Sequence, residues 1–446
     1  FANPDAVVIG AGGAGLSAAV TLHDLGREVV VLEKMPMIGG NTVRAEGGIN
    51  AAETPQQKKA GIPDTIDQFY ADTMKGGHNL NDPALVRTLT THAKDAVAWL
   101  VSLGADLNTV GRAGGAKYPR AHRPTDGSAI GPEVIRVLWK AAKDRKMDVR
   151  TQTRATEIIM KDGRVAGVKA TTKDGKVYTI DAKAVVLATG GFGANQDMLV
   201  KYQPKLKGYA TTNQPGATGD GIILAEHAGA ALVDMKQIQA HPTAAPDGTL
   251  ISESVRGDGG ILINAEGKRF TNELLTRDVV SAAELKQPGR FAWVFWDDAT
   301  RKSAKLMDSY ISMGLAVKGN TVAEIAKAMN VPAAELEATL KAYAAGKAAG
   351  KDAFGRADMP QAMQTAPFFA VKVQPAVHHT MGGVKIDTKA EVLNPAGHTI
   401  PGLFAAGEVT GGVHGGNRLG GNAQADIVTF GRIAGQSADA YLKTAK

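Results

Sequence analysis

A glycine-rich turn between a buried strand and a helix is the feature that most constrains the fold of this chain. Ala6–Ile9 is a short apolar strand, and Gly10–Gly15 follows it as a turn. Leu16–Leu25 then has the alanine and leucine content of a helix, Gly26 ends it, and Glu28–Glu33 is a second apolar strand. Two strands joined through a helix form a right-handed crossover in a parallel sheet. The start of the chain therefore predicts an α/β fold.

The glycines of this turn are spaced as Gly10-x-Gly12-x-x-Gly15, which is the fingerprint of dinucleotide binding. Gly10 permits the tight turn, Gly12 lets a pyrophosphate approach the backbone, and Gly15 lets the helix pack closely on the strand. The helix N-terminus then offers unpaired N–H groups to the phosphates. Glu33 ends the second strand, where a carboxylate accepts hydrogen bonds from ribose hydroxyls and repels a 2′-phosphate. This disfavours NADP.

Glycine-rich segments continue after the second strand, at Gly39-Gly40-Asn41-Thr42 and at Gly47-Gly48. Such a path suits a long, extended cofactor that lies close to the backbone, such as FAD. NAD is the alternative, but the chain has no second fingerprint for NAD(P)H. FAD is therefore the expected cofactor.

The composition excludes several other classes of protein. The 446 residues contain no cysteine, which rules out zinc ribbons, cysteine-ligated iron–sulfur clusters, c-type haem attachment and a dithiol redox pair within them. The net charge of +7 comes from scattered Lys and Arg, and aromatic residues make up only 5%, so no nucleic acid partner is expected. No run approaches the ~18 apolar residues of a membrane span.

Signals of the nucleotide-binding type bracket a middle segment of different character. Three segments of alternating polarity predict a meander: Ala155–Met160, Val165–Thr172 and Lys176–Ile180. From about residue 236 the chain turns to short strands and charged helices, and a strand running into glycine returns at Leu403–Glu408. We therefore expect an α/β protein with a discontinuous Rossmann-like FAD-binding domain of residues 1–235 and 378–446. Residues 236–377 would form an inserted α+β capping domain that closes over the substrate.

Several of these segments together resemble one family. They are Gly10–Gly15, Glu33, Gly39-Gly40-Asn41, Gly47-Gly48, Ala188–Phe192 and Ala406-Gly407-Glu408. With them the chain resembles the flavoproteins of the fumarate reductase and succinate dehydrogenase family, and most of all the flavin domain of soluble flavocytochrome c fumarate reductases. The resemblance covers essentially the whole chain. It implies reduction of fumarate to succinate by hydride transfer from flavin N5 and protonation by an arginine.

Polar blocks along the chain are similar to the active site of that family. They are His241-Pro242-Thr243, Ser252–Gly257, Asn272–Asp278, His378–Gly383 and His414–Asn422. The resemblance implies that Arg418 and His378 hold one carboxylate of a small dicarboxylate substrate. His241 and Ser252 would hold the other carboxylate and twist it out of the alkene plane. Gly48 and Gly421 are further expected substrate contacts.

The same resemblance implies Arg277 as the proton donor, re-protonated through Glu253 and Arg256. An arginine normally stays protonated, but the carbanion left by hydride transfer is basic enough to take its proton. The expected FAD contacts are Gly10, Gly12, Ala14, Gly15, Glu33, Asn41, Thr42, Gly47, Gly48, Asp220, His379, Glu408 and Ala423. His378 and His379 are adjacent on a strand and point to opposite faces, so no metal site is predicted from them.

The sequence departs from the family pattern at several places. Asn41 stands where membrane-bound relatives carry a histidine bonded to FAD, which implies non-covalent FAD. Ser252 replaces a threonine but keeps the hydroxyl. No Cys-x-x-Cys-His occurs, so no haem is expected in these residues and electrons must come from a separate protein or a haem domain elsewhere. The resemblance also implies a periplasmic location and allows a sodium ion near His379–Gly382 and Glu408.

Other functions fit parts of the pattern. A relative that reduces urocanate, acrylate or methacrylate would share the hydride and proton chemistry, although His241 and Ser252 favour a dicarboxylate. A flavin-binding electron-transfer or regulatory module would need neither Glu253, Arg256 nor Arg277. An oxidase of the L-aspartate oxidase type shares the fold and would produce hydrogen peroxide.

Overall fold

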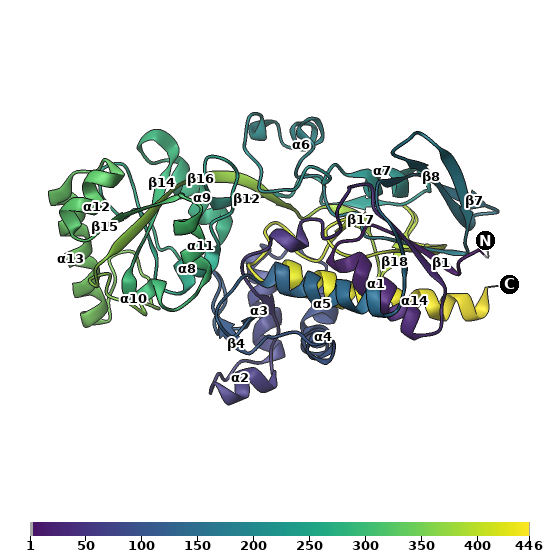
Figure 1. Ribbon diagram of the computed structural model, residues 1–446, viewed down its shortest axis with the longest axis horizontal. Helices are drawn as coiled ribbons and strands as arrows, with labels where there is room; N and C mark the ends of the chain where they lie inside the picture. Colours follow the sequence, from purple (N-terminus) through teal and green to yellow (C-terminus); the bar gives the residue numbers. More distant parts are fainter. Residues whose placement is uncertain (1–2, 446) are drawn as a thin grey trace.

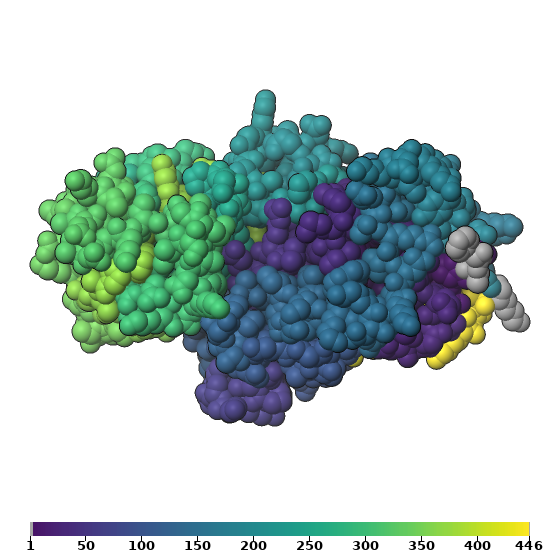
Figure 2. All heavy atoms as spheres, viewed as in Figure 1, coloured from purple at the N-terminus to yellow at the C-terminus, as the bar shows by residue number. Residues whose placement is uncertain are grey.

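The computed structural model describes residues 3–445 of the chain. Figure 1 shows a larger lobe and a smaller lobe, joined where strands β12 (Ile238–Ala244) and β16 (Phe368–Thr380) pair in antiparallel fashion. The smaller lobe, green in Figure 2, abuts the purple and blue surface of the larger lobe. An ion pair of 2.9 Å between Arg123 Nη2 and Asp258 Oδ1 is one link between the two lobes.

The larger lobe is built on a six-stranded sheet in the order β18-β19-β10-β1-β2-β6. Its strands are β1 (Ala6–Ile9), β2 (Val29–Leu32), β6 (Asp148–Arg150), β10 (Ala184–Leu187), β18 (Glu391–Leu393) and β19 (Thr399–Ala405). All neighbours pair in parallel except β18 and β19. The central strands are continuously apolar because both faces of a parallel sheet are covered. The predicted α/β class is confirmed.

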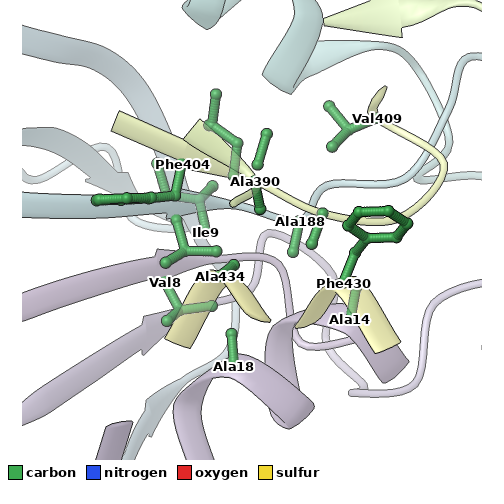
Figure 3. Close-up of a cluster of buried hydrophobic side chains, with 14 of the residues drawn as sticks. Val8, Ile9, Ala14, Ala18, Ala188, Ala390, Phe404, Val409, Phe430 and Ala434 are labelled. Carbon is green, nitrogen blue, oxygen red and sulfur yellow. The ribbon is translucent and has the colours of Figure 1, made fainter. Parts of the chain in front are cut away.

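Helices α1 (Gly13–Asp24) and α14 (Asn422–Thr444) pack against each other and against this sheet. Figure 3 shows the buried cluster that joins them, with Val8 from β1, Phe404 from β19 and Phe430 and Ala434 from α14. Burial of a side chain such as Phe430 contributes about 1.5–3 kcal/mol. The fingerprint turn is thus fixed between a packed strand and a packed helix.

The predicted meander is present as β7 (Thr153–Lys161), β8 (Arg164–Thr172) and β9 (Val177–Asp181). The other strands of the larger lobe are β3 (Ile49–Asn50), β4 (Thr109–Gly111), β5 (Ala121–Arg123), β11 (Leu232–Val233), β17 (Gly383–Lys385) and β20 (Thr410–Gly411). Its remaining helices are η1 (Thr42–Arg44), α2 (Pro55–Lys59), α3 (Ile66–Gly76), α4 (Pro83–Ser102), α5 (Ile130–Asp144), α6 (Gln196–Tyr202), η2 (Pro204–Leu206) and α7 (Asp220–His227).

The smaller lobe has a sheet in the order β12-β16-β14-β13, with β15 also paired to β16. Its further elements are α8 (Glu253–Gly257), β13 (Ile261–Ile263), α9 (Arg277–Leu285), η3 (Pro288–Arg290), β14 (Ala292–Asp297), α10 (Asp298–Arg301), α11 (Leu306–Ser312), β15 (Ala316–Gly319), α12 (Val322–Met329) and α13 (Ala333–Ala349). Two apolar clusters separate from the core of the larger lobe lie on this sheet. In one of them the rings of Trp296 and Phe369 stack at 5.8 Å.

The expected boundary between residues 377 and 378 falls inside β16, which continues from one lobe into the other. The domain limits at 236 and 377 therefore stay a prediction. Among residues 3–445, no helix combines the length and the apolar character that crossing a bilayer requires.

Candidate active site

The turn after β1 borders a cavity of about 840 Å³. Gly10 has a φ of +109°, and a Cβ there would lie 2.1 Å from the carbonyl oxygen of Ala188. A Cβ on Gly15 would lie 1.8 Å from the carbonyl oxygen of Gly10, so only glycine lets α1 pack this closely. Gly12 instead faces the cavity, and the nearest atom to its Cβ would be the Gly39 carbonyl oxygen at 3.6 Å. The backbone at Gly12 is therefore open to a bound molecule.

Glu33 lines the same cavity at the end of β2. Its Oε1 accepts a hydrogen bond of 3.1 Å from the N–H of Ala11, and its Oε2 accepts one of 3.0 Å from the N–H of Met35. Asp220, at the start of α7, lies 3.2 Å from Lys34 Nζ on the cavity wall. The Glu33 carboxylate is held beside the turn, where it can receive ribose hydroxyls. Its role in binding stays a prediction.

A second cavity, of about 830 Å³ with the space open to solvent included, continues from the first toward the smaller lobe, and the two share Asn41, Thr42, Glu408 and Ile427. The Asn41 side chain donates to Asn213 Oδ1 at 2.7 Å and accepts from the N–H of Gln214 at 2.8 Å. The predicted cofactor residues on the walls are Gly10, Gly12, Ala14, Glu33, Asn41, Thr42, Gly47, Gly48, Asp220, His379, Glu408 and Ala423. Gly15 lies behind the wall. This continuous path fits an extended dinucleotide such as FAD.

His379 and Glu408 lie on the wall of the second cavity, with His379 Nδ1 3.6 Å from Glu408 Oε1. Glu408 Oε2 accepts hydrogen bonds of 3.1 Å from the N–H and from the hydroxyl of Thr380. Burial, reinforced by the charge of Arg418, lowers the pKa of His379 well below its ordinary value, and burial raises the pKa of Glu408. The imidazole is neutral, and its buried Nε2 has no hydrogen-bond partner in residues 3–445. A sodium ion near these residues stays a prediction.

His241 on β12 and His378 on β16 come together with their rings 4.9 Å apart. His241 Nδ1 accepts a hydrogen bond of 3.1 Å from the N–H of Thr243, which assigns the proton of the neutral ring to Nε2. His378 Nδ1 lies 2.6 Å from the hydroxyl of Thr212. Burial and the charge of Arg277 lower the pKa of both histidines well below the ordinary value. His241 Nε2–H is thus a buried donor that no described residue accepts.

Ser252 is the N-cap of α8, and its Oγ accepts from the N–H of Ser254 at 3.1 Å. The N–H of Ser252 donates to the hydroxyl of Tyr310 at 2.8 Å, and that hydroxyl donates to the Glu46 carboxylate. Glu46 belongs to the larger lobe and Tyr310 to the smaller one, so this chain of hydrogen bonds fixes Ser252 across the boundary between them. Neither Tyr310 nor Glu46 was predicted as a site residue, because single polar residues 264 positions apart carry no motif.

Gln239 on β12 links the two arginines that flank the second cavity. Its Oε1 accepts a hydrogen bond of 3.3 Å from Arg277 Nη1. Its Nε2 donates to the carbonyl oxygen of Arg418 at 2.6 Å and to Asn417 Oδ1 at 2.8 Å. Burial and the charge of Arg277 lower the pKa of Arg418 to about 9. Gln239 belongs to no motif, and its only signal in the sequence is its position two residues before His241.

Arg277, the first residue of α9, lies next to Glu253, the first residue of α8. Arg277 Nε donates to Glu253 Oε1 at 3.2 Å, and Arg256 Nη2 lies 3.8 Å from the same oxygen. Glu253 Oε2 also accepts from the N–H of Gly114 at 3.2 Å. Burial opposes ionisation of Glu253, but the charges of Arg277 and Arg256 outweigh it and lower its pKa. The three predicted acid–base residues therefore form one contiguous buried group.

Glycines next to Glu253 and Arg277 leave the space that these side chains occupy. A Cβ on Gly420 would lie 2.1 Å from Glu253 Oε2 and 3.1 Å from Arg277 Nη2. Gly421 has a φ of +86°, and Gly48 would bring a Cβ within 2.9 Å of Ala121. Gly48 and Gly421 both line the second cavity, as expected for substrate contacts, whereas Gly420 was not among the predicted residues.

We call Arg256, Arg277, Arg418, Glu253 and His241 the open cluster. Arg256 Nε and Nη2, Arg418 Nε and His241 Nε2 are buried and have no hydrogen-bond partner in residues 3–445. Three guanidinium groups face one ionised carboxylate, so the cluster carries surplus positive charge in a region shielded from water. Buried charges need partners. The cluster is therefore chemically suited to a small anion that accepts several hydrogen bonds.

Comparisons with known proteins agree with this geometry. The family model described as an FAD binding domain matches residues 5–423. A fumarate reductase (cytochrome) of Shewanella frigidimarina is 50% identical over 442 residues, 98% of this chain and 77% of that protein. An NADH:fumarate oxidoreductase of Klebsiella pneumoniae is 46% identical over 97% of this chain, which spans 47% of that protein. The solved open conformation of a flavocytochrome c3 fumarate reductase matches with a TM-score of 0.81 and 46% identity, covering 98% of this chain and 78% of that one. The chain thus belongs to the FAD-binding flavoprotein family that includes the fumarate reductases.

Proposed function

We propose that this chain reduces fumarate to succinate, with non-covalently bound FAD. The observation that carries the proposal is the open cluster. Arg277, Arg418 and the Nε2–H of His241, which has no partner among the described residues, line the second cavity. Arg256, whose Nε and Nη2 are also without a partner there, lies next to Glu253, which lines the same cavity. A dicarboxylate supplies two negative charges and four acceptor oxygens, which match this surplus. Arg418 and His378 would hold one carboxylate, and His241 and Ser252 the other.

The placement of these residues supports a role in activating the alkene. Two carboxylates held by groups on different elements need not remain coplanar, and a twist of one weakens its conjugation with the double bond. Bound FAD supplies the hydride for one alkene carbon. Arg277 would then donate a proton to the neighbouring carbon, where negative charge develops.

The contacts of Arg277 support its role as the acid in this scheme. It is the first residue of α9 and lines the second cavity. Its Nε is already hydrogen-bonded to Glu253, the group that would return a proton to it, and Arg256 would in turn serve Glu253. The ionised Glu253 thus lies between the two arginines, 3.2 Å from Arg277 Nε and 3.8 Å from Arg256 Nη2, where it can carry a proton from Arg256 to Arg277.

The electrons would come from a separate donor protein or from a haem domain outside these residues, because the chain contains no cysteine for haem attachment. The periplasmic location stays a prediction from the resemblance. Reduction of urocanate, acrylate or methacrylate is the second candidate. His241 and Ser252 disfavour it, because a monocarboxylate or an imidazole leaves one of these polar groups without its partner.

The direct test is oxidation of a reduced viologen dye by purified, FAD-loaded protein, with fumarate, urocanate, acrylate and methacrylate compared at equal concentrations. We expect kcat/KM to be highest with fumarate and denaturation to release FAD. Preference for another acid would leave the hydride and proton scheme in place but overturn the assignment of the second carboxylate. Steady peroxide formation with an amino acid, and no turnover of the four acids, would overturn the proposal.

A further inference from the structure

Glu284 is a buried carboxyl group that packing does not explain. It lies in the last turn of α9, its side chain is 0% exposed, and neither carboxyl oxygen has a hydrogen-bond partner in residues 3–445. By contrast, the equally buried Glu273 accepts hydrogen bonds from Arg269, from Arg356 and from the N–H of Leu262. A buried acid without partners destabilises a fold, and an apolar side chain would fill the same space without that cost.

The surroundings keep Glu284 protonated. Burial raises its pKa well above the ordinary value, and the attraction of Arg256 opposes this only in part. The carboxyl group also lies at the C-terminal end of α9, where the helix dipole disfavours a negative charge. Glu284 therefore stores a proton at neutral pH.

This stored proton lies near the open cluster. Arg277 and Glu284 are the first and eighth residues of α9, on its buried face with Val280 and Ser281. Seven residues of helix correspond to about 10 Å of rise. Arg256 is the charged group that acts on Glu284, and its Nε and Nη2 are themselves without partners. The two side chains form no direct ion pair or hydrogen bond, so a proton that passes between them needs a bridge, for which we propose an intervening water molecule.

We infer that Glu284 is the outermost proton donor of the relay that re-protonates Arg277, an inference that rests on the proposed function. After Arg277 gives its proton to the substrate carbon, Arg256 transfers a proton to the ionised Glu253 carboxylate, which passes it on to the neutral Arg277. The Glu284 carboxyl group then transfers its proton through the intervening water to Arg256 and becomes a carboxylate. A proton from solvent restores it. Each step moves one proton and leaves every group as it began after one turnover.

The position of Glu284 along α9 suits this role. Arg277 begins the helix at the cavity, whereas Lys286 is exposed two residues after Glu284. The relay therefore extends from the substrate to just below the surface. The charged groups on the neighbouring elements that influence Arg256 are Glu253, Arg277 and Glu273, and none of them lies within hydrogen-bond distance of Glu284. Glu284 thus acts through Arg256 and is a positioning residue for protons, without contact with the substrate.

The test uses the FAD-loaded protein and the variants Glu284→Gln and Glu284→Met, with Glu337→Gln as a control at an exposed carboxylate of the same lobe. Removal of a proton station should lower kcat for fumarate by roughly 10- to 100-fold, increasingly so at high pH, with KM and FAD content unchanged. Glu284→Met should at the same time raise Tm, because an unpartnered acid is replaced by an apolar side chain. A merely structural residue would not combine slower turnover with higher stability.

A second readout does not depend on turnover. At pH 7 the infrared carbonyl band of protonated carboxyl groups should lose the contribution of one group in Glu284→Gln relative to the wild type, and should be unchanged in Glu337→Gln. Absence of this difference, or full kcat in both Glu284 variants across pH 6–9, would overturn the role of Glu284 alone. Wild-type protein that does not reduce fumarate would overturn the proposed function, and the relay with it.

Discussion

Two neighbouring clusters of buried arginines and carboxylates differ in how completely they are paired; one lies in the smaller lobe, and the other, the open cluster, also includes Arg418 of the larger lobe. Arg269, Glu273, Asp352 and Arg356 form what we call the paired cluster. Arg269 makes four hydrogen bonds of 2.6–3.2 Å to Glu273 and Asp352, and Arg356 donates to Glu273 at 3.2 Å. None of its polar atoms is buried without a partner, whereas the open cluster leaves four such nitrogens.

The difference separates structure from function. The charges of the paired cluster neutralise one another. In addition, Arg356 Nη2 donates to the carbonyl oxygen of Arg256 at 2.8 Å, which fixes the backbone of this open-cluster residue. The open cluster is held together by few internal bonds and keeps its donors for a ligand. We therefore expect mutations in the open cluster to change activity and mutations in the paired cluster to change stability.

The largest effect is expected at Arg277. Arg277→Gln removes the proposed acid, and kcat for fumarate should fall by roughly 10²–10⁴-fold. The FAD content should change little, because Arg277 lines only the second cavity, whereas most of the predicted FAD contacts line the first. The dye assay and the flavin absorbance of the purified variant measure the two quantities. Turnover at the wild-type rate would remove Arg277 from the mechanism and would place the acid elsewhere in the open cluster.

The corresponding change in the paired cluster is Glu273→Gln. It leaves the buried guanidinium groups of Arg269 and Arg356 without their shared negative charge, which should lower the free energy of unfolding by about 3–5 kcal/mol. The measurement is urea denaturation of the FAD-loaded protein. Glu337→Gln is the matched control, since its exposed pair with Lys341 contributes about 0–1 kcal/mol. Equal stability of the two variants would mean that the paired cluster is not what stabilises this lobe.

Sequence patterns predicted the larger lobe well because its signals are local. The alternating polarity of the three segments predicts the meander of β7, β8 and β9 within one or two residues at each end.

The smaller lobe was predicted only as a change of character. Its sheet depends on pairing between β12 and β16, which lie more than a hundred residues apart, and no periodicity encodes that register. The site residues carried by motifs, such as Arg277 and Arg418, were identified through the family resemblance. Gln239, Tyr310 and Glu284 carry no motif, and only the burial and hydrogen-bond pattern of the folded chain singles them out.

A smaller loss of kcat is expected when only the distance between Glu253 and Arg277 is changed. Gly420→Ala would place a Cβ 2.1 Å from Glu253 Oε2, so Glu253 and Arg277 must move apart without loss of any charge. Displacement of about 1 Å can lower kcat by up to roughly 10²-fold, and we expect a loss of at least about tenfold. Gly416→Ala in the same loop is the control, because the nearest atom to its Cβ would be a side-chain carbon of His78 at 3.1 Å. Equal kcat in both variants would show that the spacing of the open cluster is not critical.

The smallest effect concerns the contact between the lobes at Glu46. Burial raises the pKa of Glu46 from its ordinary 4.5 to about 7, against the hydrogen bond from Tyr310. The folded protein therefore binds more protons here than the unfolded chain between these two values. The stability from protonated Glu46 is complete below about pH 4.5 and is lost as pH rises through about 7.

Glu46→Gln mimics the protonated acid and should remove this dependence. The Tm of the variant should equal that of the wild type at pH 5 and exceed it increasingly up to pH 8. At pH 8 the free energies of unfolding should differ by an amount on the order of 1–2 kcal/mol, because the carboxyl group is partly exposed to water. Thermal unfolding of FAD-loaded protein across this range measures it, with Tyr310→Phe as a second variant that lacks the hydrogen bond. A difference in Tm that does not vary with pH would show that the fold does not raise the pKa of Glu46.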